Sequence, residues 1–505
     1  MNRKEFLRTV AAGAAGTLAG SAELPAAQST GAVARAKLTG DELKGSTRAV
    51  VDFITGARLE SFPPEAIAQA KRCLIDGFGV ILAGSTVEGS AIVRRYARTM
   101  GSKGGASIFG PERISAAAPH AALANGASGH AMDFDDTQLS TTPDRTYGLL
   151  THPTVPALAS SLAVAEERRA SGSAFLEAFL TGFEVECKIA EAIDPEHYRR
   201  GFHSTATAGT FAGAAAASRL LGLDRAHAAH AIGIAASCAA GLRVNFGSMT
   251  KPLHAGRAAE NGIVAAMLAE GGFTAGDDGL DGKWGYFQVL GGGAEPHRLI
   301  GALGRPHSIV SPGVSVKPYP CGSLSHPSMD AMLKLVVDHN IQPDQIKAIR
   351  LRAGSNILEP LRYKTAKTEL EAKFCVPFLL GVIALRRKAG IQEFTDEFVS
   401  SAPIQQMMTK VSTVFDPKIE ALGFDKIRSV VEIDLMDGRA LVQTSDERYR
   451  GSPAWPFSIA ELRDRFADCA APVLSKARIQ QALDQIESIE KLRDVSELTR
   501  TLADI

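Results

Sequence analysis

The chain has 505 residues, enough for two or three domains with large cores. Hydrophobic residues make up 45% and charged residues 22%, which is an ordinary globular composition. The 55 basic and 55 acidic residues give a formal net charge of +0. The composition therefore excludes a global field that would attract nucleic acid or an anionic membrane surface, and any anionic ligand must be met by local charge.

Residues 1–43 predict an export signal and a linker rather than part of a domain. The start, Met1 to Arg8, is basic, and a weakly apolar Ala/Gly run follows it, which is the layout of a secretory signal. The segment Arg3-Lys4-x-Phe6-Leu7 resembles a twin-arginine signal with lysine in place of the second arginine. We expect a periplasmic protein if this signal functions and a cytoplasmic one otherwise. No later run has the apolar length of a membrane-spanning helix.

Residues 45–310 predict an all-helical domain, because apolar residues recur there at helical spacing between proline starts and glycine ends. Several of these helices carry few large side chains, so we expect them to pack closely within one α layer. The expected helices are 47–83 with a break at Pro63-Pro64, 91–100, 116–131, 155–167, 174–193, 205–221, 226–242 and 253–268.

Residues 311–455 predict a smaller α+β domain. Strand-like runs appear at 346–352, 430–435 and 440–444, and Met436-Asp437-Gly438-Arg439 between the last two is a strong hairpin signal. Helices are expected at 327–339 and 372–388. From 456 to 505 the pattern returns to helix, at 459–466 and 479–498, and we expect these helices to pack back on the helical domain. The predicted fold class is mainly α.

The cysteines indicate neither a metal site nor a disulfide framework. They have no Cys-x-x-Cys spacing, and scattered cysteines of this kind are typical of buried apolar positions. The chain also lacks a phosphate-binding glycine motif before a helix and a Gly-x-Ser-x-Gly nucleophile turn. The six cysteines are Cys73, Cys187, Cys238, Cys321, Cys375 and Cys469.

A polar cluster at residues 129–137 interrupts the Ala-rich helices. Asp133, Asp135 and Asp136 lie within four residues of one another, after His130 and before Thr137. Charged residues are rarely buried unless paired. The cluster is therefore either a solvated loop with helix-capping residues or one half of a polar site.

Basic or titratable residues at the start of helices recur along the chain. His152, Lys251 and Lys317 each precede a proline, and His203 precedes Ser204-Thr205. A residue before proline leaves the α region, and proline favours the first helical turn, so His152, His203 and Lys251 are expected at helix N-termini, which favour anions. Singly, each is more ordinarily a cap or a solvated residue; their recurrence indicates a pocket for a small polycarboxylate. A metal bound by His130, His152 and the aspartates would have no established ligand spacing.

Five motifs in order resemble the MmgE/PrpD family over nearly all of residues 45–505. This family includes 2-methylcitrate dehydratases, cis-aconitate decarboxylases and an iminodisuccinate epimerase. The resemblance implies a large all-helical domain with a smaller α+β lid domain, a homodimer, an active site between the two domains, and catalysis without metal or organic cofactor. The motifs are 129–137 (GHAMDFDDT), His152-Pro153, Gly201-Phe202-His203, 251–256 (KPLHAG) and 316–321 (VKPYPC).

The resemblance also places Asp133, Thr137, His152, His203 and Lys251 in the pocket and Lys317 on its lid side, and we assign their roles from their chemistry. His152 and His203 are expected to be general base and acid in an open order, with Lys251 stabilising negative charge and Asp133 orienting its neighbours as further catalytic residues. Substrate-binding roles fall to Thr137, Lys317 and His254, the last because it lies one turn into the Lys251 helix. Phe378 aligns with a tyrosine of the family's decarboxylases and methylcitrate dehydratases, which questions transfer of either activity.

The sequence therefore predicts a cofactor-independent lyase, a dehydratase/hydratase or a decarboxylase, acting on a small di- or tricarboxylate. The shared chemistry is proton transfer next to a carboxylate. Two alternatives stay open: an epimerase or isomerase on a related diacid, and an exported carboxylate-binding protein without turnover. No nucleic acid and no membrane is expected as a partner.

Overall fold

The structure is a computed structural model that describes residues 38–100, 103–112, 114–138, 151–424, 426–446 and 448–503. The predicted export signal lies outside the described residues. Within them the fold is mainly α with a smaller α+β portion, as the sequence predicts.

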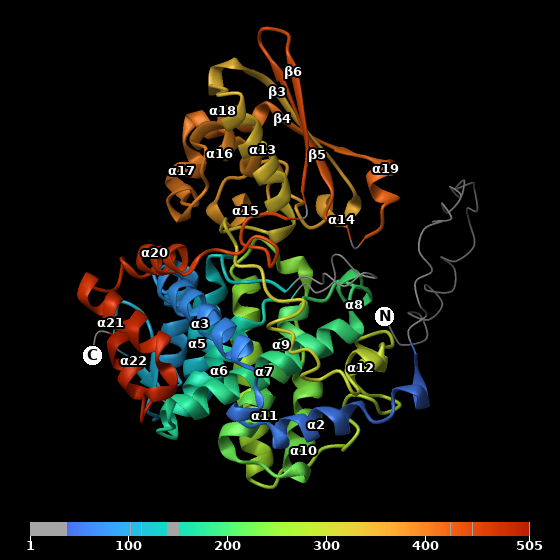
Figure 1. Ribbon diagram of the computed structural model, residues 1–505, viewed down its shortest axis with the longest axis vertical. Helices are drawn as coiled ribbons and strands as arrows, with labels where there is room; N and C mark the ends of the chain where they lie inside the picture. The colour runs from blue at the N-terminus through green and yellow to red at the C-terminus, as the bar shows by residue number, and fades with distance from the viewer. Residues whose placement is uncertain are drawn as a thin grey trace, which may run out of the picture. The chain divides into compact units, whose positions relative to one another are not determined.

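Helices dominate the chain up to residue 289 (Figure 1). They begin and end close to their predicted positions, because the proline and glycine signals mark real helix ends. The short antiparallel pair β1 (Ala106–Ile108) and β2 (Ile114–Ala116) was not predicted. The helices are α2 (Ser46–Gly56), α3 (Pro64–Gly84), α4 (Glu88–Thr99), α5 (Ala118–Ala131), α6 (Thr154–Glu167), α7 (Gly172–Ile193), α8 (Glu196–Arg199), α9 (Ser204–Leu221), α10 (Arg225–Cys238), α11 (Thr250–Glu270) and α12 (Tyr286–Val289).

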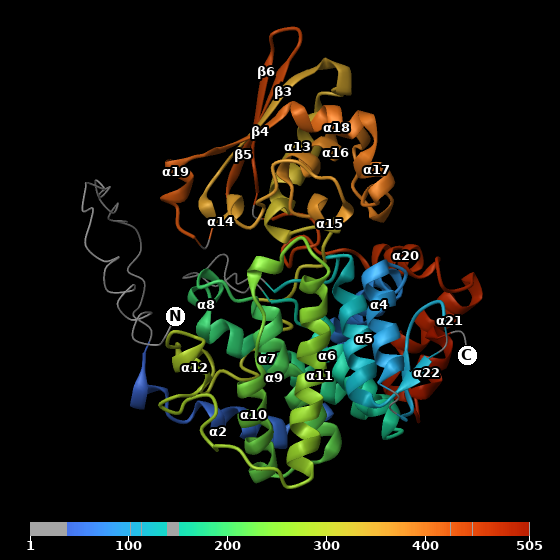
Figure 2. The same ribbon diagram turned by 180° about the vertical axis from the view of Figure 1, so that it is seen from behind.

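Helix α11 lies at the centre of this layer and packs on α5, α6, α9 and α10 (Figure 2). Its approach to α5 is backbone to backbone. A Cβ added at Gly126 of α5 would lie 2.8 Å from the Cα of Gly256 of α11, and one added at Gly256 would lie 2.2 Å from the carbonyl oxygen of Leu123. The small residues of these helices therefore set the spacing that brings the N-terminus of α11 beside the C-terminal end of α5.

A four-stranded sheet in the order β4-β3-β5-β6 forms the α+β portion. Strand β3 is parallel to β4 and antiparallel to β5, and β5 and β6 form the predicted hairpin. The edge strand β4 was missed, because its short run has only one buried residue. The elements are α13 (His326–Asp338), β3 (Ile346–Ala353), α14 (Ser355–Leu358), α15 (Glu369–Ala372), α16 (Val376–Arg386), α17 (Asp396–Ser400), α18 (Ala402–Thr409), β4 (Val411–Phe415), α19 (Pro417–Glu420), β5 (Ser429–Leu435) and β6 (Ala440–Thr444).

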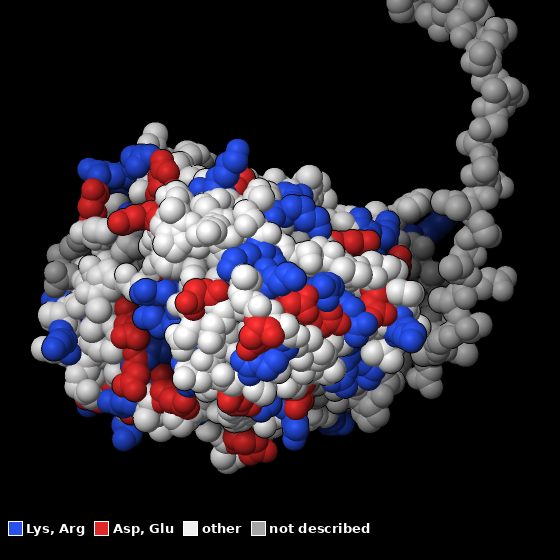
Figure 3. All heavy atoms as spheres, turned by 90° about the horizontal axis from the view of Figure 1, so that it is seen from above, with Lys and Arg blue, Asp and Glu red and all other residues white. Residues whose placement is uncertain are grey.

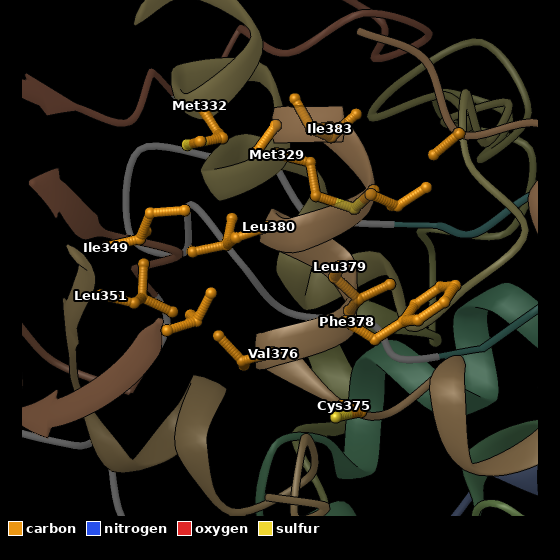
Figure 4. Packing of buried hydrophobic residues seen from close by; sticks show 14 of the residues in the cluster. Met329, Met332, Ile349, Leu351, Cys375, Val376, Phe378, Leu379, Leu380 and Ile383 are labelled. Carbon is orange, nitrogen blue, oxygen red and sulfur yellow. The ribbon is translucent and has the colours of Figure 1, made fainter. Parts of the chain in front are cut away.

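The core of this portion lies between the sheet and helices α13 and α16 (Figure 4). Alternate residues of the strands face it, Ile349 and Leu351 from β3 among them, and they meet Met332 of α13 and Leu380 of α16. Strand alternation of period two thus buries one face of the sheet, as a two-layer α+β arrangement requires.

The last helices are α20 (Ile459–Ala470), α21 (Lys476–Glu487) and α22 (Ser496–Leu502). The expected single helix 479–498 is wrong, because a 3₁₀ turn at Ile489–Lys491 separates α21 from α22. Helix α20 packs on α3, where Phe466 shares a buried apolar cluster with Phe78.

Five of the six cysteines are buried, Cys238 is half-buried, and all six are free thiols. Among the described residues, no helix is both long and apolar enough to cross a membrane.

The close approach of α5 and α11 makes a stability prediction. Gly256→Ala would place a methyl group against the carbonyl oxygen of Leu123, and overpacking of this kind costs about 1–3 kcal/mol. We expect a clearly lower melting temperature in a thermal unfolding scan. Gly56→Ala is the matched control, because a Cβ at this helical glycine has nothing within 4 Å and alanine is the better helix former. Equal melting temperatures for the two variants would contradict the packing argument.

Candidate active site

Helix ends converge on one buried site. His203 is the N-cap of α9, Lys251 lies in the first turn of α11, and His152 stands two residues before α6. The prediction that these three residues lie at helix N-termini is confirmed. Asp133 follows the C-terminal end of α5, and all four side chains are buried. Residues up to 118 positions apart in the sequence are thus in contact.

These side chains line a cavity of about 40 Å³. A volume of this size holds about three water molecules, so a larger ligand would need the surrounding side chains to move. One part of the lining is polar and the other is aromatic or aliphatic. The lining residues are Asp133, Thr137, His152, Tyr198, His203, Phe246, Lys251, Lys317, Gly322, Ser323, Leu324, Pro360, Leu361 and Phe374.

The carboxylate of Asp133 joins the two lysines of the cavity. Its Oδ1 accepts hydrogen bonds from Lys251 Nζ at 2.9 Å and from Lys317 Nζ at 2.7 Å. Its Oδ2 is buried and has no partner among the described residues. Burial alone would raise the pKa of Asp133, but the two ammonium groups outweigh it and hold this pKa well below its usual value. Asp133 is therefore an anion in the site.

The two lysines differ in how many of their ammonium N–H groups already donate to the protein. Lys317 donates to the Asp133 side chain, to the Asp133 carbonyl oxygen at 3.0 Å and to the Cys321 carbonyl oxygen at 3.1 Å. An ammonium group has three donors, so all three are engaged. Lys251 donates to Asp133 and to His130, which leaves one N–H. Lys251 is therefore the cation that can meet a substrate carboxylate without losing a protein contact.

His130 accepts a hydrogen bond from Lys251, and Asp135 in turn accepts one from His130. The Nδ1–H of His130 donates to Asp135, whose two carboxylate oxygens both lie at 2.9 Å, and its Nε2 accepts from Lys251 Nζ at 2.7 Å. These contacts fix one tautomer of a neutral imidazole. The sequence offered His130 only as a possible metal ligand; the contact with Lys251 depends on helix packing and has no local sequence signal.

The other histidines are fixed through Nδ1. His152 donates from Nδ1 to the Asp136 carbonyl oxygen at 2.9 Å, so its Nε2 carries the lone pair. His203 Nδ1 lies 3.1 Å from Nδ1 of His254, and its Nε2 is buried without a partner among the described residues. His254 does not line the cavity and contacts the site through His203. The hydroxyl of Thr137 lies 3.4 Å from His152 Nδ1, a long contact.

Burial keeps the imidazoles neutral. It lowers the pKa of His152 and of His203 well below 6.5; Asp135 opposes the shift at His152, and the ammonium group of Lys251 adds to the shift at His203. Burial also lowers the pKa of Lys251, although Asp133 opposes that shift. Behind the site, burial and the nearby Asp76 raise the pKa of Asp136 to about 8. The site thus combines neutral bases with a destabilised ammonium group.

Phe378 lies outside the cavity, which corrects the role that its alignment suggested. Its ring packs on Phe394 and Phe398, with centroids 5.2 and 6.3 Å away, inside the α+β core (Figure 4). The aromatic residues that do line the cavity are Tyr198, Phe246 and Phe374. Sequence reasoning missed all three, because nothing in their local sequence separates a cavity-facing ring from a core ring.

Ligand atoms of His130, His152 and His203 lie within 4.8 Å of one another, a spacing that a metal ion could bridge. Nε2 of His130 is however occupied by Lys251 at 2.7 Å, so a cation there would have to displace an ammonium group and lie near a second one.

Charge elsewhere is mixed. On the face shown in Figure 3, acidic and basic side chains are interspersed rather than gathered into one field. This agrees with the balanced composition of the chain.

The fold and the site define a mainly helical protein with a buried cluster of imidazole, ammonium and carboxylate groups. Residues 48–299 match the model of the MmgE/PrpD N-terminal domain and residues 319–489 that of the MmgE/PrpD C-terminal domain, and the chain belongs to this family. Its relatives include the cis-aconitate decarboxylases of Homo sapiens, 27% identical, and Mus musculus, 28% identical; the alignments cover 91% of this chain and 95% and 94% of those proteins. A cis-aconitate decarboxylase of Aspergillus terreus is 24% identical over 91% of this chain and 96% of its own length.

The pKa shifts predict the pH dependence of activity. Because the pKa values of His152 and His203 are lowered, both imidazoles are protonated only at a pH below 6.5. Because the pKa of Lys251 is lowered, its ammonium group loses its proton at a pH below 10.5. With a substrate fully ionised over the range, we expect the acid limb of the kcat/KM profile below pH 6.5 and the basic limb below pH 10.5. Thermal unfolding at each pH is the control for loss of fold. An acid limb at or above pH 6.5 would contradict neutral imidazole bases.

Proposed function

We propose that the protein is a cofactor-independent lyase, a dehydratase/hydratase or decarboxylase, that acts on a small di- or tricarboxylate by proton transfer next to a carboxylate. The observation that carries this proposal is the meeting of neutral imidazoles and an available ammonium N–H in one buried cavity. The names of the relatives support a lyase that acts on a carboxylate.

Each polar residue has a role in this proposal. His152, with its Nε2 lone pair, removes the proton from carbon, and Lys251 binds the adjacent carboxylate and stabilises the negative charge that develops there. His203 exchanges the second proton with the substrate through Nε2, either donating it or accepting it. A bound dianion raises the pKa of His203, because a nearby negative charge favours the imidazolium. Asp133 holds Lys251 in place, Lys317 in turn holds Asp133, and Thr137 binds the substrate by its hydroxyl.

An epimerase is the second candidate function, and one observation favours it. His152 and His203 stand at the N-termini of different helices, and their ring centroids are 6.3 Å apart. Two bases on opposite sides of one carbon would remove a proton from one face and return it to the other. The same site without turnover would be a carboxylate-binding protein.

We also propose that the protein acts as a homodimer, as the family resemblance implies. Helix α11 exposes Val264, Met267 and Leu268, which are 37–40% exposed, and contiguous exposed apolar side chains of this kind are typical of interfaces.

Proton NMR in deuterated buffer tests the function. Purified protein is incubated with citrate, 2-methylcitrate, cis-aconitate, itaconate, malate and aspartate-derived diacids. We expect a C–H signal to disappear together with formation of an alkene or loss of a carboxyl group. Deuterium exchange without net elimination would instead establish the epimerase. Saturable binding of a compound without any chemical change would contradict catalysis. It would instead support a carboxylate-binding protein without turnover.

Substitutions at the polar residues test the assigned roles. Lys251→Met and His203→Asn remove the charge-stabilising and proton-transfer groups, and each is expected to lower kcat by at least about 100-fold. Lys71→Met is the matched control, because this half-buried lysine of α3 pairs with Glu490 at 2.8 Å and does not line the cavity. The measurements are steady-state kinetics and circular dichroism. Wild-type turnover in a folded Lys251→Met or His203→Asn variant would refute the assignment.

A further inference from the structure

Tyr198 is a polar cavity residue for which the proposed mechanism has no role. It belongs to the short helix α8, five residues before His203, and its side chain is buried with 3% exposed. It lines the same cavity as Asp133 and Lys251. Within the described part of the chain, its hydroxyl makes no hydrogen bond to the protein. A buried phenol normally has a hydrogen-bond partner, so this O–H is available to a ligand.

Arg243 fixes the ring of Tyr198. Its guanidinium carbon lies 3.8 Å from the ring centroid, and its Nη1 donates to the Tyr198 carbonyl oxygen at 2.9 Å. The backbone N–H of Tyr198 donates to Asp194 Oδ1 at 3.2 Å. Main chain and ring are therefore both held, while no described residue accepts a hydrogen bond from the hydroxyl. A cation on the ring face draws electron density from the ring, which makes the phenol a stronger donor.

The phenol remains protonated throughout the physiological range. Burial raises the pKa of Tyr198 to about 12, although Arg243 opposes the shift. A group with this pKa donates a hydrogen bond and does not act as a base near neutral pH. It therefore belongs with the groups that bind and stabilise an anion.

The other hydrogen-bond donors of the cavity are too few to bind two carboxylates, so a further neutral donor is needed. Of the two lysines, only Lys251 has an N–H that no described residue accepts. Beside Lys251 and the Thr137 hydroxyl, a substrate with two or more carboxylates calls for further donors, since a buried carboxylate without partners is costly. Ser323 also lines the cavity, but an aliphatic hydroxyl is a weaker acid than a phenol and a weaker donor to an anion.

We propose that Tyr198 is a substrate-binding residue whose phenolic O–H donates a hydrogen bond to a second carboxylate of the substrate, with Arg243 holding the ring in place. This inference rests on the proposed function, because it takes a di- or tricarboxylate as the ligand. It identifies the pair Tyr198 and Arg243 as a determinant of selectivity for diacids over monoacids. No bond is formed or broken by Tyr198, so the proton stays on its oxygen throughout.

Tyr198→Phe is the direct test, because it removes the hydroxyl and keeps the ring stacked under Arg243. A hydrogen bond to a charged group contributes about 1.5–3 kcal/mol, so we expect kcat/KM for the diacid substrate to fall by about 10- to 150-fold. Tyr286→Phe is the matched control: this tyrosine is buried with 3% exposed, packs on Phe211 with ring centroids 4.8 Å apart, does not line the cavity, and is expected to leave kcat/KM within about threefold. Both variants are expected to keep the wild-type melting temperature.

Calorimetric titration with the same diacid and with a matched monoacid separates the outcomes. Tyr198→Phe should weaken binding of the diacid at least tenfold and leave binding of the monoacid nearly unchanged. If the wild type turns over a diacid and Tyr198→Phe matches it in affinity and kcat/KM, the inference about Tyr198 is overturned and the proposed function stands. If the wild type neither binds nor converts any diacid, the proposed function fails and the inference fails with it.

Discussion

The carboxylate of Asp133 is the constraint on which the site depends. Lys251 comes from the helical layer and Lys317 from the segment that leads into the α+β portion, and both ammonium groups donate to the same oxygen. Without that oxygen, two buried like charges would lie close together with only backbone and imidazole acceptors. Removing one partner from a buried ion pair typically costs 3–5 kcal/mol. Asp133 is therefore as much a structural residue as a functional one.

The backbone contributes to the same contact. Asp133 has φ of 48°, a left-handed conformation that aspartate tolerates better than most residues. This conformation lets its carbonyl oxygen and its side chain both face Lys317. Lys373 adds a second link between the two portions, since its Nζ donates to the carbonyl oxygen of Ala131 at 3.2 Å, where the dipole of α5 favours a cation. The end of α5 is thus held from the α+β side by two lysines.

Close helix packing determines the chemistry that the site can perform. Because Gly126 and Gly256 let α5 and α11 approach at backbone distance, Lys251 reaches both Asp133 and His130. The same exclusion of water lowers the pKa values of His152 and His203, so they remain bases at neutral pH. Burial also strengthens the field of the ammonium groups. A site of this kind is preorganised to stabilise negative charge, as the proposed proton transfer next to a carboxylate requires.

The sequence by itself determined the elements and most of the polar lining. Proline and glycine signals located the helix ends, period-two alternation and an Asp-Gly turn located the β5–β6 hairpin, and the residues before proline marked His152, Lys251 and Lys317. These features are local, so they can be read from short segments. The strand β4 and the division of α21 from α22 were missed, because their local patterns are weak.

Only the tertiary structure decided which side chains meet. The bond from Lys251 to His130 joins residues 121 positions apart, and the stacking of Arg243 on Tyr198 depends on how a loop lies against a short helix. Family alignment directed attention to Phe378, yet its ring is enclosed in the α+β core, whereas Tyr198, in no recognised motif, faces the cavity. Spacing along the chain reports where a helix begins; whether a ring on that helix faces the core or a cavity is set by the neighbouring elements that pack around it.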